Sequence, residues 1–250
     1  PGSVCPLQLT AVSTKDGTKV DVVKAVTTVP LSYQPDAKIR NLADAVYTGD
    51  NLYTTTGLAQ TRAQAALPNQ AAVYLMHVQN DGNTTDTFTV TGTAGNGAWT
   101  VRYYNAATSA EITSQLTGAG YSTGALAPGA YAWLRVLVTP TGAAIAGHSF
   151  VATVTARSLY ETARQDVVTA VTTVPLSYQP DGKIRNLADA AYIGDNRYNI
   201  TGADQTKMQS ALPHQTAVYL MHVQNDGTTA DTFTVTGTAG NGAWTVRYYN

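Results

Sequence analysis

The sequence has 250 residues, of which 44% are apolar and only 12% are charged, against roughly 25% charged residues in an average soluble protein. Its formal net charge of -1 offers no basic field to a phosphate backbone, so we expect no nucleic-acid partner. The chain has no run of about 18 apolar residues, so we also expect no insertion into a membrane.

The first segment carries the chain's one cysteine, Cys5, which alternates with Leu7 and Leu9. A single cysteine excludes an intrachain disulfide and a metal site made of clustered thiols. Because the alternation puts Cys5 on the same side as the two leucines, we expect its thiol to be buried.

A domain boundary is predicted at TTVPLSYQPD, which occurs at residues 27–36 and again at 172–181. Its two prolines remove backbone donors and favour extended conformations, so the preceding strand DVVKAVTTV should end there. The link between units is then short and stiff.

The irregular stretch that follows holds the chain's metal candidates, Asp36, Asp44, Asp50 and Asn51. Their oxygens suit calcium, but their spacing matches no EF-hand loop. The simpler interpretation is that these side chains cap turns. We therefore expect no cofactor, and calcium stays open as the alternative. Further along, LAQTRAQAAL at residues 58–67 is compatible with a short helical turn closed by Pro68.

Strict alternation then predicts strands. In AVYLMHVQN, Tyr74, Met76 and Val78 fall on one face, and the intervening residues fall on the other. The same period places further residues inward: Phe88, Val90, Trp99, Val101, Tyr103, Leu134, Val136, Val138, Phe150, Ala152 and Val154. Turn sequences such as NDGN and LAPG separate these strands. The pattern is typical of an all-β, antiparallel β-sandwich.

Three apolar side chains, Leu75, Trp133 and Leu137, should project away from this core. Charged residues that discourage adhesive faces are sparse, so we predict that these three form an assembly surface. The alternative is that loops of the same unit cover them.

The chain also contains an internal duplication. Residues 21–105 align without gaps on residues 166–250, at an offset of 145, with 69 of 85 positions identical. We predict tandem domains of about 145 residues: residues 1–34 are the closing strands of a preceding repeat, 35–178 a complete sandwich and 179–250 the first half of the next repeat.

The incomplete copy has two explanations. The sequence is a window on a longer tandem polypeptide, or strands from another molecule complete the half repeat by strand exchange. The first is favoured, because equivalents of residues 106–145 are missing even after exchange. A native polypeptide of only 26.3 kDa would contradict it.

The sequence shows no catalytic pattern. There is no G-x-S-x-G nucleophile turn, and the four histidines have no metal-ligand spacing. We therefore expect that the chain is not an enzyme.

The segments YLMHVQNDGNTTDTFTVTGTAGNGAWTVRYY, TGALAPGAYAWLRVLVTP and ATVTARS resemble the tandem immunoglobulin-like β-sandwich repeats of large secreted and surface proteins of bacteria. This resemblance implies tandem Ig-like domains that serve as stalks, filaments, adhesin shafts or noncatalytic modules.

We accordingly predict an extracellular or cell-surface structural protein that builds a filament, tube or layer through repeat–repeat and strand-edge contacts, with itself as partner. The alternative is an adhesin stalk or a carbohydrate-binding accessory module of a secreted protein. Its partner would be surface glycans, bound by an aromatic patch for which Tyr104, Tyr121 and Trp133 are the candidates.

Overall fold

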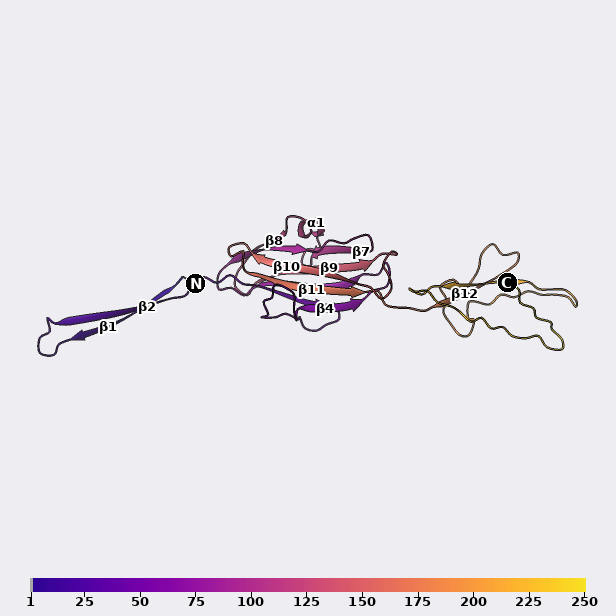
Figure 1. Cartoon of the computed structure of the whole chain (residues 1–250), viewed down its shortest axis with the longest axis horizontal. Helices are drawn as coiled ribbons and strands as arrows, with labels where there is room; N and C mark the ends of the chain where they lie inside the picture. Colours follow the sequence, from indigo (N-terminus) through magenta and orange to yellow (C-terminus); the bar gives the residue numbers. More distant parts are fainter. Residues whose placement is uncertain (1) are drawn as a thin grey trace. The chain divides into compact units, whose positions relative to one another are not determined.

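The computed structural model describes residues 2–250 and consists almost entirely of strands and loops (Figure 1). In chain order its elements are β1 (Val4–Val12), β2 (Val20–Thr28), β3 (Pro35–Asn41), β4 (Thr61–Ala65), β5 (Ala72–Asn80), β6 (Asp86–Gly92), β7 (Trp99–Asn105), α1 (Thr113–Leu116), β8 (Tyr121–Leu126), β9 (Tyr131–Pro140), β10 (Ser149–Ser158), β11 (Gln165–Thr173), β12 (Pro180–Asn186) and β13 (Tyr219–Asn225). Within residues 2–250, no helix has the length and apolar character needed to cross a lipid bilayer.

The chain divides into two compact units between Val174 and Pro175, inside the second copy of the proline-containing stretch. Each unit is described by itself. The finer division into residues 1–34, 35–178 and 179–250 stays a prediction.

The first unit contains a sandwich of two sheets. One has the strand order β4-β11-β10-β6-β8 and the other β3-β5-β9-β7. All neighbours are antiparallel except β11 and β4, which are parallel. Inner side chains of both sheets form one continuous apolar core. The predicted all-β class and antiparallel β-sandwich are confirmed.

The core follows the predicted alternation. Tyr74, Phe88 and Val136 are fully buried, and Trp99 packs on the half-buried Phe150 with ring centroids 5.6 Å apart. Such burial stabilises the sandwich by roughly 1.5–3 kcal/mol for each large apolar side chain. Tyr103 also lies in this core, where its hydroxyl donates to the Thr93 carbonyl at 2.9 Å.

In the turn sequence NDG, the buried side-chain amide of Asn80 holds the connection in place by hydrogen bonds. The Asn80 side chain donates from Nδ2 to the carbonyls of Thr84 and Leu126, both at 2.8 Å, and its Oδ1 accepts from Gly82 N at 2.9 Å. One asparagine therefore satisfies backbone groups at the ends of two β-connections.

The short helical turn with which residues 58–67 are compatible does not form. Residues 61–65 form strand β4, which pairs in parallel with β11 because that edge of the five-stranded sheet offers free backbone groups. The exposed residues Thr61 and Ala63 alternate with the half-buried Arg62 and Gln64, which is the period of a strand. The one named helix of the described chain, α1, is four residues long and was not predicted.

Strands β1 and β2 form a separate two-stranded sheet, the β1–β2 hairpin, whose residues are exposed. The predicted burial of Cys5 is therefore wrong: its thiol is free and exposed. The alternation was correctly read, but no other described strand pairs with this hairpin.

The second unit contains a β12–β13 pair with the register of β3–β5, Pro180 facing Asn225 as Pro35 faces Asn80. Residues 231–237 and 244–250 are identical in sequence to β6 and β7, yet this described segment forms no strand there. In the first unit β6 pairs with β8 and β10, and β7 pairs with β9. Whether these seven-residue segments form strands therefore depends on the strands that pair with them and not on their own sequence alone.

Candidate functional site

The outer face of the four-stranded sheet carries the three predicted assembly residues. The register places His77 opposite Trp133, Leu75 opposite Arg135 and Val73 opposite Leu137. Trp133 is 46% exposed, and Leu75 and Leu137 are half-buried. The structure thus brings the three residues onto one face of two neighbouring strands.

An aromatic cluster extends this surface. His77 lies between Tyr47 and Tyr131, with ring centroids 4.0 and 4.5 Å away, and Trp133 is 5.6 Å from the same imidazole. Tyr131 is also 46% exposed. We call these four residues the aromatic face. His77, Tyr131 and Trp133 belong to strands β5 and β9, and Tyr47 packs on His77. Because the rings pack on one another and three of the four belong to strands, the face is a preformed contact surface.

His77 is uncharged at neutral pH. Burial, and then the positive charges of Lys38 and Arg40, lower its pKa from 6.5 to about 4. Arg40 itself lies over the Tyr47 ring at 5.2 Å, and Arg135 lies over Tyr104 at 4.8 Å. His77, at the centre of the aromatic face, is therefore uncharged, and the neighbouring cations Arg40 and Arg135 lie over the rings of Tyr47 and Tyr104.

The three carboxylates among the calcium candidates, Asp36, Asp44 and Asp50, each pair with a cation. Asp36 lies 3.1 Å from Lys38 Nζ, which also pairs with Asp50. Asp44 accepts from Asn41 N at 3.0 Å and pairs with Arg62. Asn51 has a positive φ of 57°, as expected for a turn residue.

Burial raises the pKa of Asp36 to about 6, and Lys38 acts in the opposite direction. Among residues 2–250, no three side chains of the His, Cys, Asp and Glu types gather into a metal-sized group. Asp36, Lys38 and Asp50 therefore form one ion-paired group, which we call the turn cluster.

A second buried carboxylate, Asp166, was not singled out by the sequence. It accepts from Ala37 N at 2.7 Å, from Thr54 N at 2.8 Å and from Gln60 Nε2 at 2.6 Å. We call these four residues the Asp166 network. Burial raises the pKa of Asp166 to about 6, and backbone donors, including Ala37 and Thr54, oppose the shift. The network joins β11 to β3 and to the loop before β4.

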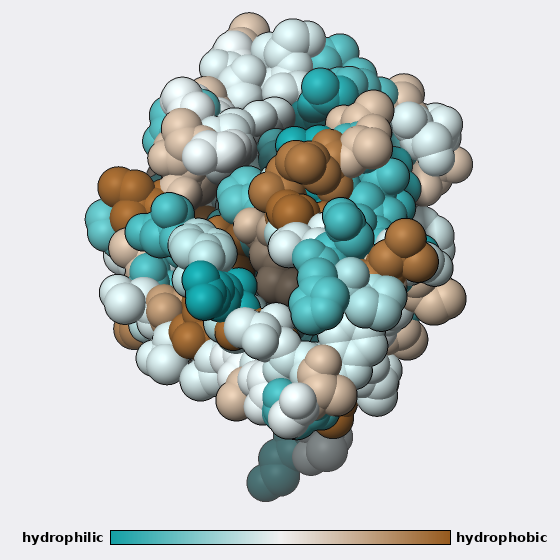
Figure 2. Space-filling view, turned by 90° about the vertical axis from the view of Figure 1, so that its right-hand side faces the viewer, coloured by the Kyte–Doolittle hydropathy of each residue, from teal (hydrophilic) through white to brown (hydrophobic). Residues whose placement is uncertain are grey.

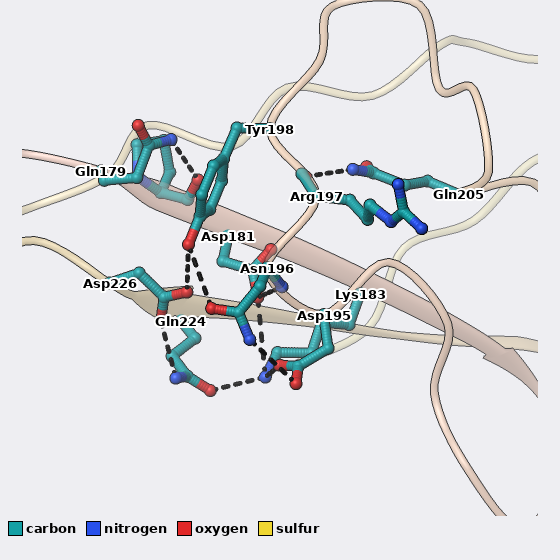
Figure 3. A network of polar contacts seen from close by, with 11 residues as sticks. Gln179, Asp181, Lys183, Asp195, Asn196, Arg197, Tyr198, Gln205, Gln224 and Asp226 are labelled. Atoms are coloured by element: carbon teal, nitrogen blue, oxygen red, sulfur yellow. Dashed lines mark hydrogen bonds and ion pairs between the residues drawn. The ribbon is translucent and has the colours of Figure 1, made fainter.

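Residues 175–250 repeat the turn cluster (Figure 3). Lys183 pairs with Asp195 and Asp181 and donates to Gln224 Oε1 at 2.7 Å. The Tyr198 hydroxyl donates to Asp226 at 2.9 Å, as Tyr53 does to Asp81 at 3.0 Å in the first unit. The cluster is therefore a property of the duplicated sequence and serves as a turn structure in both copies.

The contact of the equivalent glutamines differs between the copies. Gln205 is the equivalent of Gln60, but its Nε2 donates to the Arg197 carbonyl and not to a carboxylate (Figure 3). In the first unit, Gln60 Nε2 donates instead to the carboxylate of Asp166, which belongs to β11.

The other two candidates for glycan binding, Tyr104 and Tyr121, lie on strands β7 and β8 and contact polar side chains of the same unit. Tyr121 accepts from Asn105 Nδ2 at 2.9 Å, and Tyr104 stacks on Arg135. Exposed aromatic area is instead provided by Trp133 and Tyr131 on a strand. Tyr131 was missed because it stands at the first position of β9, directly after the turn that the prediction used as a boundary.

No family model matches, and no curated protein matches. Among solved structures, the PapD-like domain 7 of human CEP192 is similar at 11% identity and a TM-score of 0.31, over 56% of this chain and 84% of that one. A family 123 glycoside hydrolase from Clostridium perfringens is similar at 8% identity and a TM-score of 0.34, over 56% of this chain and 27% of that one. With both TM-scores below 0.5, neither likeness carries a conclusion.

Proposed function

We propose that this chain is an extracellular structural repeat protein of bacterial type, a building block of a surface filament, tube or layer. It assembles through repeat–repeat and strand-edge contacts with copies of itself. In this proposal the 145-residue duplication reflects a tandem array of immunoglobulin-like sandwich domains.

The aromatic face is the observation that carries the proposal. It presents Trp133 and Tyr131, each 46% exposed, beside Leu75 and Leu137 on one sheet. Large exposed aromatic side chains on a rigid surface are the usual anchors of protein interfaces. A weak contact of this kind, repeated along an array, gains strength from multivalency.

The chemistry of the surface supports the same function. Only 12% of the residues are charged, so few like charges oppose the approach of a second copy. The central imidazole of the aromatic face, His77, is neutral above its pKa of about 4, so contact at neutral pH buries no charge there.

Sedimentation velocity of the full chain tests this function. We expect concentration-dependent self-association that is lost in the Trp133→Ser variant. Ile145→Ser is the matched control, because Ile145 is an exposed apolar residue of the same unit outside the aromatic face. Association that survives Trp133→Ser unchanged would contradict the role of this face.

The same face fits a second function, glycan binding by an accessory module. The rings of Tyr131 and Trp133 are 5.9 Å apart and inclined by 22°, so they form a platform on which sugar rings can stack. In that case the chain stays monomeric and binds polysaccharide in a manner that depends on Trp133. Dispersed particles with such binding would favour this alternative.

A further inference from the structure

Two arginines lie in one row across the outer face of the four-stranded sheet. Arg40 of β3 is opposite Leu75 of β5, and Leu75 is opposite Arg135 of β9. The next strand, β7, places Tyr104 opposite Arg135. Because neighbouring strands lie about 4.8 Å apart, the backbones of the two arginines are separated by roughly 10 Å, with Leu75 between them.

Neither arginine has a carboxylate partner among residues 2–250. Arg40 Nη1 donates only to the backbone carbonyls of Leu42 and Asp44. The Arg135 guanidinium lies over the Tyr104 ring at 4.8 Å, and its Nε is buried without a hydrogen-bond partner in the described chain. Three other arginines of the first unit do pair with acids: Arg62, Arg102 and Arg164.

The positive charge reaches the centre of the aromatic face. After burial, the charges of Lys38 and Arg40 are the causes that lower the pKa of His77 to about 4. Lys38 is itself paired within the turn cluster. An anion at this face therefore meets two cations, Arg40 and Arg135, whose charge no carboxylate of the described chain balances by direct contact.

The rings beside this row form a flat apolar platform. Tyr131 and Trp133 are inclined by 22° to one another and are each 46% exposed. The His77 ring is inclined to them by only 8° and 14°. Sugar rings have flat C–H faces that stack on such a platform and leave the aromatic surface out of water. The acidic side chains of a peptide carry no ring of this kind, so the platform favours a sugar.

Exposed apolar residues alone do not single out a binding surface. On the face shown in Figure 2, apolar residues (brown) lie in separate small groups among polar and neutral ones (teal and white). The aromatic face is different, because its rings contact one another and the row of Arg40 and Arg135 lies beside them.

Residues 175–250 repeat part of this arrangement. Arg185 lies over the Tyr192 ring at 5.2 Å, as Arg40 lies over Tyr47, and the ring centroids of Tyr192 and His222 are 5.9 Å apart. Arg185 likewise pairs with no carboxylate in the part of the chain that the structure describes. The arginine–tyrosine–histidine group is therefore a property of the duplicated sequence.

We propose that the outer face of the four-stranded sheet binds an acidic polysaccharide, with sugar rings stacked on Tyr131 and Trp133 and sugar carboxylates paired with Arg40 and Arg135. A guanidinium donates two parallel hydrogen bonds to a carboxylate, and these charge-assisted bonds are stronger than those to a neutral sugar. The inference rests on the second function proposed above, glycan binding, and names the class of glycan. In a tandem array each sandwich presents one such face, so a long polysaccharide gains strength from multivalency.

Isothermal titration calorimetry of the full chain with two forms of one polysaccharide tests the proposal. Polygalacturonate has a carboxylate on each sugar, and its methyl ester has the same backbone without the charge. We expect polygalacturonate to bind with an affinity that falls as salt is added. The ester should bind about tenfold more weakly or less, because it loses the charge-assisted hydrogen bonds.

Variants of the two arginines locate the binding. Arg40→Gln and Arg135→Gln should each lower the affinity for polygalacturonate about tenfold. Arg135→Lys keeps the charge but not the planar fork, so it should retain more affinity than Arg135→Gln. The matched control is Arg157→Gln on β10 of the other sheet, where Arg157 donates to Gln165 Oε1 at 2.9 Å; it should leave the affinity unchanged. Melting temperatures measured by circular dichroism show whether each variant is folded.

The outcomes separate this inference from the proposed functions. Equal affinity for the acid and the ester would overturn the inference and leave glycan binding intact. An equal loss of affinity in Arg157→Gln would overturn it by showing unspecific charge attraction, and polyglutamate bound as tightly as polygalacturonate would identify an acidic peptide as the ligand instead. If neither polysaccharide binds, the inference and the glycan function both fail, whereas self-assembly stands or falls with the sedimentation of Trp133→Ser.

Discussion

Replacing Asp166 with alanine should strongly destabilise the first unit. The carboxylate is fully buried and accepts from Ala37 N, Thr54 N and Gln60 Nε2 at 2.6–2.8 Å. Each buried donor left without a partner costs about 1–3 kcal/mol. Because losses within one network are not additive, we expect the free energy of unfolding to fall by about 3–5 kcal/mol.

Urea unfolding followed by tryptophan fluorescence measures this loss, since Trp99 is buried in the core of the same unit. The matched control is Asp21→Ala, which removes the equivalent carboxylate from the exposed hairpin. At a concentration where the chain is monomeric, the control should change the free energy of unfolding by less than about 0.5 kcal/mol. If Asp166→Ala costs no more than Asp21→Ala, the account of the Asp166 network is wrong.

Three further predictions use the same internal comparison or the same site. Tyr74→Phe should lower the free energy of unfolding by about 1–2 kcal/mol, as measured in urea, whereas Tyr219→Phe should change it little; equal effects would contradict the contact to β11. Gly57→Ala should lower the melting temperature measured by circular dichroism more than Gly202→Ala, since both glycines have a positive φ but only the first is crowded by a side chain; the reverse order would refute the crowding. The His77 imidazole should titrate near pH 4 in an NMR experiment, because burial and nearby cations disfavour its charged form, so its share of stability is present above pH 6.5 and lost as the pH falls towards 4; titration near 6.5 would contradict this.

The sandwich core was predictable because its signal is local. Tyr74, Met76 and Val78 alternate within five residues, and all three are buried as the period requires. The same holds for Phe88 and Val90. Each strand carries its own pattern, so one sequence suffices.

The errors came from context that local patterns do not contain. Residues 61–65 form a strand because β11 lies beside them, more than 100 residues away along the chain. Cys5 alternates as an inward residue but is exposed because no described strand covers its hairpin. Residues 231–237 match β6 in every letter and yet form no strand.

The site was only partly predictable for the same reason. The alternation of inward and outward residues along each strand predicted that Trp133 and Leu75 point outward. The aromatic face also includes Tyr47, which lies in a loop and has no such pattern. The Asp166 carboxylate accepts a hydrogen bond from Ala37 N, which lies 129 positions away in the sequence, so no local motif connects the two residues. Asp36 and Lys38 did offer a signal: two positions apart on a strand, opposite charges share one face and pair.

Electron microscopy of the purified full chain over a range of concentrations tests most directly whether this sandwich protein builds an assembly from its own copies. The account predicts filaments, tubes or sheets with a regular repeat, and their loss when Trp133 is replaced by serine. Dispersed single particles of one chain at every concentration would contradict it.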